Sequence, residues 1–421
     1  MEEALKKVLI SAVIGDALGR PCEGLTKGHL KEHGNLSDDF IDPHPLLKGK
    51  MERWTMPGLY SSQAQLMFIT AFSSLKAFFD PDVFFGLSLM GIEKGPGEYG
   101  IFRNPPFFVR SFLKRLSDQE QIKTGNRINS AGFLPVLFPV ALYARSRKKL
   151  MLDVISFASI VQADHSLTAA ALSLSCFLHG LLCGERPADG EVMSAAVQNN
   201  SIVCSEMDGI APEIFKMGMN PASLTDQLLR LGRILESLSG CTDLDRGEKI
   251  ICDKVNESLK TPVTRATVDH PFTIYPFVQL IVGSGQCQPD GLLHFCARLG
   301  GSSSTLTSIA GIISAALFDE NPYPPSLTNG LVNRKLIFSL AESLSRGAVA
   351  VNLADEFITA EAGLTKTEID QRNAKLKHTR SRSTKTSDSY ADRHERLSKH
   401  VVESWTKIDK ARWKKERKKL E

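Results

Sequence analysis

Near its amino terminus the chain reads Gly15-Asp16-Ala17-Leu18-Gly19-Arg20-Pro21-Cys22-Glu23. The residues before this stretch predict a helix, because Ala4, Val8 and Ala12 recur at helical spacing. We expect the helix to end near Gly15, which places Asp16 and Glu23 in the loop that follows. Asp16 is interpreted as a residue that caps or braces this loop. Glu23 is either a general acid or base or a carboxylate with a local hydrogen bond.

Outward from this stretch, helical patterns dominate the chain. Besides an apolar stretch that begins at 276–281, the segments expected to be helical are 64–79, 132–144, 153–182, several between 201 and 258, and 306–317. The last of these consists mainly of small residues, which suits close helix packing. We find no sustained alternation of apolar and polar residues and no Asn-Gly hairpin. Two segments rich in glycine and proline, 25–58 and 91–106, are interpreted as long loops, so the sequence predicts an all-α globule with functional loops.

The charge is unevenly distributed along the chain. The protein has 421 residues, of which 42% are hydrophobic, so it can bury a large core. Its formal net charge is +4, yet residues 366–421 alone carry 18 Lys and Arg against 9 Asp and Glu. A mildly acidic body therefore precedes a basic tail, which could contact nucleic acid, an anionic membrane or the body itself.

The composition of the sequence changes after about Asn352. We predict a body over 1–352, a flexible linker over 353–390 and a basic amphipathic helix over 391–421. The predicted helix has Leu397, Val401, Trp405 and Ile408 on one face, flanked by Lys and Arg. Its expected partner is the body, another protein or copy of the chain, an anionic membrane surface or nucleic acid.

The cysteines and the apolar runs bear on the compartment. None of the eight cysteines forms a CxxC pair, and we expect all of them to be free thiols in a reducing compartment. The apolar run 8–14 is too short for a signal peptide and is interrupted by Asp16. No stretch reaches the roughly 18 apolar residues of a membrane span. The sequence thus predicts a cytoplasmic protein without an integral membrane segment.

Two further motifs follow the opening stretch, which is the first motif. The second motif reads Gly58-Leu59-Tyr60-Ser61-Ser62-Gln63-Ala64-Gln65-Leu66. The third motif reads Gly300-Gly301-Ser302-Ser303-Ser304-Thr305, with Ile309-Ala310-Gly311 after it. Weaker matches lie at 130–139 and at Asp164-His165. In this order and spacing, the segments resemble the ADP-ribosylglycohydrolase family, which includes the dinitrogenase-reductase-activating glycohydrolase, over residues 1 to about 330.

The resemblance implies a fold and a reaction. It implies an orthogonal all-α globule with long loops around a central cleft, where an N- or O-glycosidic bond to ADP-ribose is hydrolysed, usually with two magnesium ions. Magnesium prefers carboxylate oxygens and water. Two such ions about 3.5–4 Å apart repel each other by roughly 18 kcal/mol even at an effective dielectric near 20, so several carboxylates must surround them.

This chain departs from the family pattern where those carboxylates are needed. The two aspartates of the family's second motif are replaced by Ser62 and Gln63, and those of its third motif by Ser302 and Ser304. Neutral hydroxyls and amides cannot balance two dications. We therefore expect no metal site and no magnesium cofactor.

The resemblance also nominates site residues. Glu23 is the catalytic candidate. The ligand-binding candidates are Asp16, Ser61, Ser62, Gln63, Gly132, His165, Gly300, Gly301, Ser302, Ser304 and Thr305. His165 either contacts a substrate or is a hydrogen-bonded core histidine. Gly300 and Gly301 either offer backbone N–H groups to a phosphate or form a tight turn into a packed helix.

Three functions follow from these observations. The first is a degenerate, metal-free member of the family that binds an ADP-ribose-like ligand or a protein partner. The second is an active hydrolase of ADP-ribosyl linkages that uses Glu23. The third is an interaction protein that acts through the basic helix 391–421.

Overall fold

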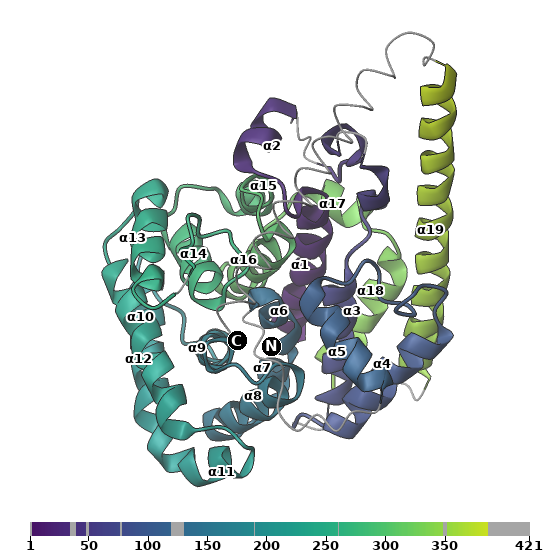
Figure 1. The fold of residues 1–421 in the computed structure, drawn as a ribbon. Coiled ribbons are helices and arrows are strands. Elements are labelled where there is room, and N and C mark those ends of the chain that lie inside the picture. The colour runs from purple at the N-terminus through teal and green to yellow at the C-terminus, as the bar shows by residue number, and fades with distance from the viewer. Residues whose placement is uncertain are drawn as a thin grey trace, which may run out of the picture.

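The computed structural model describes residues 2–33, 39–47, 50–75, 78–118, 130–188, 190–259, 261–347 and 352–385. Every regular element in these ranges is a helix (Figure 1), which confirms the all-α prediction. Extended pairing within them is limited to isolated bridges, such as the one between Thr26 and Gly300.

The helices are numbered in chain order. The first half contains α1 (Glu2–Gly19), α2 (Lys27–His33), α3 (Ser62–Ser73), α4 (Pro81–Lys94), α5 (Phe107–Ser117), α6 (Leu134–Leu137), α7 (Pro139–Tyr143), α8 (Arg147–Val161) and α9 (His165–Leu182). The second half contains α10 (Val192–Glu206), α11 (Ala211–Lys216), α12 (Pro221–Ser237), α13 (Leu244–Asn256), α14 (Pro271–Gly283), α15 (Leu292–Arg298), α16 (Ser303–Leu317), α17 (Pro325–Gly330), α18 (Arg334–Ser345) and α19 (Leu353–Lys385). Short 3₁₀ turns connect several of them.

The centre of the fold is the pair formed by α1 and α16, whose backbones touch. A Cβ on Gly15 would lie 2.5 Å from the carbonyl oxygen of Thr307, and one on Gly311 would lie 2.6 Å from that of Ser11. The Ser308 hydroxyl donates a hydrogen bond of 3.0 Å across the contact to the Ala12 carbonyl. The predicted close packing of the small-residue helix at 306–317 is confirmed.

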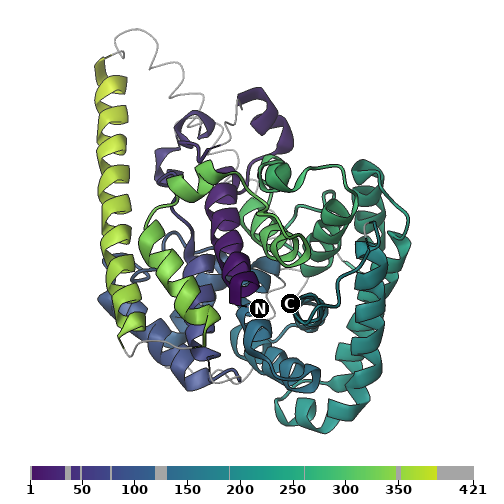
Figure 2. The same cartoon turned by 180° about the vertical axis from the view of Figure 1, so that it is seen from behind.

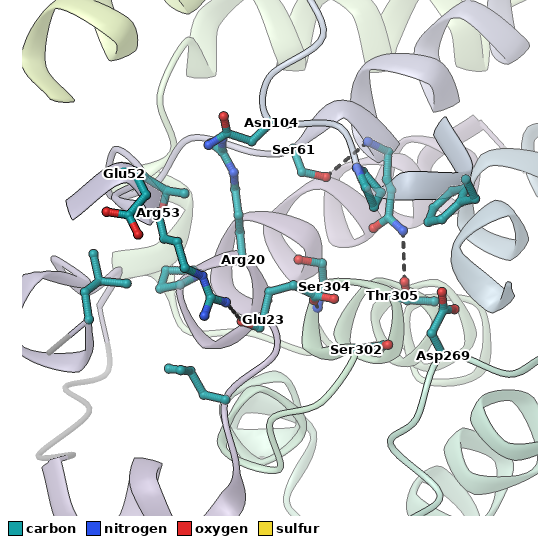
Figure 3. Close-up of a pocket in the computed structure, with 17 residues that line it drawn as sticks. Arg20, Glu23, Glu52, Arg53, Ser61, Asn104, Asp269, Ser302, Ser304 and Thr305 are labelled. Atoms are coloured by element: carbon teal, nitrogen blue, oxygen red, sulfur yellow. Dashed lines mark hydrogen bonds between the residues drawn. The ribbon is translucent and has the colours of Figure 1, made fainter. Parts of the chain in front are cut away.

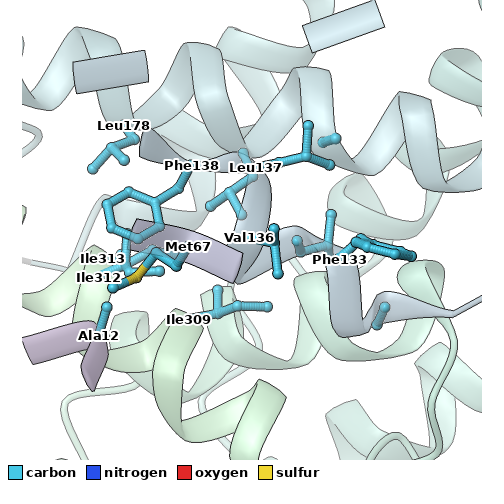
Figure 4. Packing of buried hydrophobic residues seen from close by; sticks show 14 of the residues in the cluster. Ala12, Met67, Phe133, Val136, Leu137, Phe138, Leu178, Ile309, Ile312 and Ile313 are labelled. Atoms are coloured by element: carbon cyan, nitrogen blue, oxygen red, sulfur yellow. The ribbon is translucent and has the colours of Figure 1, made fainter. Parts of the chain in front are cut away.

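The short helix α6 fills the space beside this pair (Figure 4). Its apolar side chains pack between α3, α9 and α16, so that Val136 and Phe138 lie among Met67, Ile309 and Ile312. Val136 is fully buried in this apolar cluster.

The boundaries of several elements differ from the sequence-based predictions. The predicted helical segment 153–182 is divided between α8 and α9, and the predicted loop 25–58 contains α2. Helix α1 continues through Asp16 to Gly19. A Cβ on Gly19 would lie 2.4 Å from the Ser303 carbonyl oxygen, so the last turn of α1 can pack against α16 only through a residue without Cβ. Asp80 and Pro81, interpreted as the end of one helix, begin the next. The Asp80 carboxylate accepts from the N–H groups of Asp82 and Val83, and Pro81 occupies the first turn, where no N–H is needed.

Among the described helices, α9 has the length and hydropathy that a membrane span requires. However, 78% of that window is buried inside the protein, as expected for a core helix. This burial favours a core helix, although the prediction that no stretch reaches the length of a membrane span does not hold for α9. All eight cysteines are free. The cytoplasmic location stays a prediction.

The carboxyl-terminal region corrects the predicted linker over 353–390. Residues 353–385 form α19, a long helix that lies along one side of the body (Figures 1 and 2). Its inner face buries Phe357, Ile358, Glu361 and Glu368. Two of these four residues are carboxylates. The buried face therefore lacks the apolar periodicity from which a helix is predicted, and the sequence pattern indicates a linker instead. The predicted basic helix at 391–421 lies outside the described residues and stays a prediction, as do its partners.

Candidate functional site

A cavity of about 320 Å³ lies where the three motifs meet (Figure 3). Among the sequence-predicted site residues, those that line it are Glu23, Ser61, Gln63, Ser302, Ser304 and Thr305. A wall of the cavity comes from residues 39–47 and 50–56, which we call the wall loop and which contributes Leu47, Glu52, Arg53 and Thr55. The loop before α5 adds Asn104 and Pro106, and α5 itself adds Phe108.

Asp16 joins the first motif to the second from behind the cavity. Its carboxylate accepts hydrogen bonds from the Ser61 backbone N–H at 2.6 Å and from the Ser61 hydroxyl at 2.8 Å. Burial raises the pKa of Asp16, and both hydrogen bonds oppose that shift. The predicted bracing role fits these contacts, although Asp16 lies in the last turn of α1 and not in a loop.

Glu23 joins the first motif to the third. Its Oε2 accepts from the Ser304 backbone N–H at 2.9 Å, at the first turn of α16, where a negative charge is favourable. Burial raises the pKa of Glu23 to about 7, the charges of Asp269 and Asp16 add to the shift, and the Ser304 hydrogen bond opposes it. Glu23 thus changes protonation near neutral pH at the cavity surface.

Gln63 connects three segments with one amide group. Its Nε2 donates to the Thr305 hydroxyl at 2.9 Å and to the Gly132 carbonyl at 3.2 Å. The Ser61 hydroxyl accepts from the Gln63 backbone N–H and so caps α3. The Gln63 Oε1 atom is buried and has no hydrogen-bond partner among the described residues. An acceptor in this state favours a donor brought by water or a ligand.

Asp269 lines the cavity but was not identified from the sequence. It accepts from the Ser130 hydroxyl at 2.6 Å and from the Ala131 backbone N–H at 2.8 Å, so it fixes the segment before α6. Burial raises its pKa, and these hydrogen bonds oppose the shift. A signal was present: Asp269 precedes His270 and Pro271, and a proline at a helix start marks a loop that enters a buried helix.

Gly300 and Gly301 form a tight turn with positive φ angles of 69° and 66°. The Gly300 N–H donates to the Ala297 carbonyl, and the Gly301 N–H donates to the Leu25 carbonyl. Both N–H groups are therefore engaged, which favours the tight-turn interpretation over the phosphate interpretation. A Cβ on Gly301 would lie 2.4 Å from the Thr267 carbonyl oxygen, so this turn requires glycine.

The remaining candidates lie next to the cavity or away from it. Gly132 adjoins the cavity through its carbonyl, and a Cβ there would collide with the Phe108 ring at 2.0 Å. Ser62 is buried in the first turn of α3 and does not line the cavity. His165 is the first residue of α9, capped by Asp164, and is not among the lining residues.

A buried ionic layer lies behind the first and second motifs. Arg20, which also lines the cavity, pairs with Glu368 of α19 at 3.0 Å. Arg103 pairs with Glu361 at 2.6 Å, and both side chains are fully buried. Glu361 also accepts from the Tyr60 hydroxyl and the Gln65 amide of the second motif. These carboxylates on α19 therefore neutralise the cations beneath the cavity.

Comparisons with known proteins agree with this architecture. The family model described as ADP-ribosylglycohydrolase matches residues 1–354. A solved structure titled "ADP-ribosylglycohydrolase-related protein complex" superposes with a TM-score of 0.54 at 17% identity, covering 83% of this chain and 99% of that one. A search of curated proteins found no match. The family match covers most of the chain, and α19 lies almost entirely beyond it. The chain belongs to the ADP-ribosylglycohydrolase family.

Proposed function

We propose that this protein binds an ADP-ribose-like ligand in the cavity without the paired magnesium ions of its family, and that it is degenerate as a hydrolase. The observation that carries the proposal is the Gln63 amide, which directs an N–H donor at Thr305 inside the cavity wall. A cation at this position would need an oxygen acceptor in its place. The Gln63 side chain therefore links the second motif to the third through a hydrogen bond.

The other donors support the same proposal. The carboxylates nearest the cavity are Asp16, Glu23 and Asp269, and each already accepts a backbone N–H at 2.6–2.9 Å. Burial raises the pKa of all three, and the hydrogen bonds that they accept oppose the shift. These residues do not fit two dications that repel each other by roughly 18 kcal/mol. We therefore derive no step through magnesium.

The lining suits a polar, anionic ligand of nucleotide-sugar type. Ser302, Ser304 and Thr305 supply hydroxyls, and Gln63 Oε1 is an acceptor that a sugar hydroxyl would satisfy. Arg53 is exposed beside the cavity and can donate to a phosphate. A few placed polar groups in a partly apolar pocket are typical of small-molecule sites.

Calorimetric titration of the full chain with ADP-ribose, in magnesium and in chelator, tests the proposal. We expect the same dissociation constant in both buffers. At a ligand concentration one hundred times that constant, the free energy of unfolding should rise by about 2.7 kcal/mol. Magnesium alone should leave the melting temperature unchanged. Binding that requires magnesium would contradict the proposal.

A matched pair of variants locates the ligand. Gln63→Leu removes the amide at nearly constant volume and should weaken ADP-ribose binding about tenfold, since one buried hydrogen bond is lost. Gln162→Leu is the control, because Gln162 is also buried but lies at the end of α8, away from the cavity lining. Equal affinity of the two variants would place the ligand elsewhere.

A hydrolase that uses Glu23 without paired metals is the second candidate. It is favoured by one observation: Glu23 lines the cavity, has a pKa of about 7 and interacts electrostatically with Asp269. A carboxyl group poised near neutral pH can donate or accept a proton. ADP-ribose release from an ADP-ribosylated substrate, measured in chelator, should then vanish in Glu23→Gln. Undetectable release by the parent protein would leave binding as the function.

A further inference from the structure

The second half of α19 holds the wall loop, and neither the family match nor the proposed function accounts for this contact. The wall loop has a small apolar cluster of its own, formed by Leu47, Met51 and Trp54 and separate from the main core. Leu376 of α19 packs against this cluster. The upper half of α19 lies beside the wall loop in both views of the fold (Figures 1 and 2).

Polar contacts reinforce the packing at each turn of the helix. Glu368 accepts from the Met56 backbone N–H at 2.9 Å, and the Arg372 Nε donates to the Trp54 carbonyl at 3.0 Å. One turn further, Lys375 donates to Asp42 at 3.1 Å. The Lys375 ammonium also lies 4.7 Å from the centre of the Trp54 ring. The helix therefore satisfies main-chain groups of the wall loop that lie away from the cavity.

Arg372 and Glu368 each contact a residue that lines the cavity. Arg372 donates to the Asn104 side chain at 3.0 Å, and Asn104 lines the cavity. Glu368 pairs with Arg20, which also lines the cavity. On the cavity side, Arg53 of the wall loop donates to the Glu23 carbonyl at 2.8 Å. A shift of α19 would thus move groups on both sides of the site.

We propose that residues 368–376 of α19 form a positioning strap that holds the wall loop against the cavity, so that strap docking and ligand binding stabilise each other. Glu368 and Arg372 act through the wall loop and through Arg20, and are positioning residues. Because linkage is reciprocal, a ligand that contacts the wall loop must also stabilise the docked strap. The ligand half of this statement rests on the proposed function, whereas the structural half does not.

Hydrogen exchange of the full chain, measured first without ligand, tests the structural half. Arg372→Ala removes the contacts to Trp54 and Asn104 and the 3.3 Å ion pair with Glu368, but leaves the Glu368–Arg20 pair in place. Amides at 50–56 should then exchange about tenfold faster, as expected for one or two lost hydrogen bonds. Amides of α1 and α16 should not change. Lys366→Ala, at an exposed position of the same helix, is the matched control.

A second variant distinguishes loss of the strap contact from a general folding defect. Leu376→Ala removes only the packing on the Leu47, Met51 and Trp54 cluster and should produce a smaller acceleration at the same amides. If the amides at 50–56 exchange at unchanged rates in both Arg372→Ala and Leu376→Ala, the strap proposal is wrong. It is also wrong if Lys366→Ala accelerates exchange at these amides as much as Arg372→Ala does.

Ligand titration then tests the coupling. ADP-ribose should bind Arg372→Ala about tenfold more weakly than the parent and should slow exchange at 368–376 in the parent protein. Equal affinities, or no protection of the strap by bound ligand, would overturn the coupling. If ADP-ribose fails to bind the parent, the proposed function fails, while the ligand-free exchange still decides whether the strap exists.

Discussion

The two sides of the cavity are built by different means. On the side of α1 and α16, helix backbones touch through small residues, and the Glu23 carboxylate accepts a hydrogen bond from the Ser304 backbone N–H of the third motif. On the opposite side, the wall loop reaches the main core through Leu46 and has a small apolar cluster of its own, on which α19 packs. Close packing makes the first side rigid, whereas the second can respond to its surroundings.

The largest effect is expected from the ionic layer that anchors α19. Glu361→Ala should lower the free energy of unfolding by about 3–5 kcal/mol, because it leaves the fully buried Arg103 without its counter-ion. Chemical denaturation measures this difference. Glu356→Ala, at an exposed position one turn earlier, should change it by less than about 0.5 kcal/mol. A small loss for Glu361→Ala would mean that α19 contributes little to the fold.

The α1–α16 contact should be the next most sensitive feature. Gly15→Ala places a methyl group 2.5 Å from the Thr307 carbonyl oxygen, and the helices must separate by a few tenths of an ångström or more. We expect a loss of about 2–3 kcal/mol in the free energy of unfolding. Gly86→Ala in α4 is the matched control, because a Cβ there meets nothing within 4 Å. The control should gain up to about 1 kcal/mol from helix propensity.

A smaller, pH-dependent effect is expected from Glu23. Its pKa is about 7 in the folded protein, against an ordinary value of 4.5 for a glutamate, so the unfolded chain loses this proton first as the pH rises. The contribution of Glu23 to stability is therefore full below about pH 4.5 and is lost as the pH rises through 7. Glu23→Gln should raise the melting temperature relative to the parent at about pH 8 and not at about pH 4.5.

The exposed Glu52 of the wall loop provides the comparison for this measurement. Glu52→Gln should give the same difference from the parent at both pH values. A pH-independent effect of Glu23→Gln would show that Glu23 is not the residue whose proton is linked to folding.

The sequence predicted the helical class and six of the 17 residues that line the cavity, because the motifs keep their glycines and hydroxyls where helices begin. It misplaced α19, since Glu361 and Glu368 are acidic residues that only their arginine partners allow to be buried. Those partners lie more than 250 residues earlier, and no local pattern connects them. Asp269 was missed for a similar reason: its partners Ser130 and Ala131 are distant in sequence.

The ion pairs between α19 and the body have a consequence for where this protein ends as a folding unit. The family match stops at residue 354, before both Glu361 and Glu368. A chain cut there would remove the ion-pair partners of the buried Arg20 and Arg103. We therefore expect the smallest stable version of this protein to extend past the family boundary, at least through Glu368.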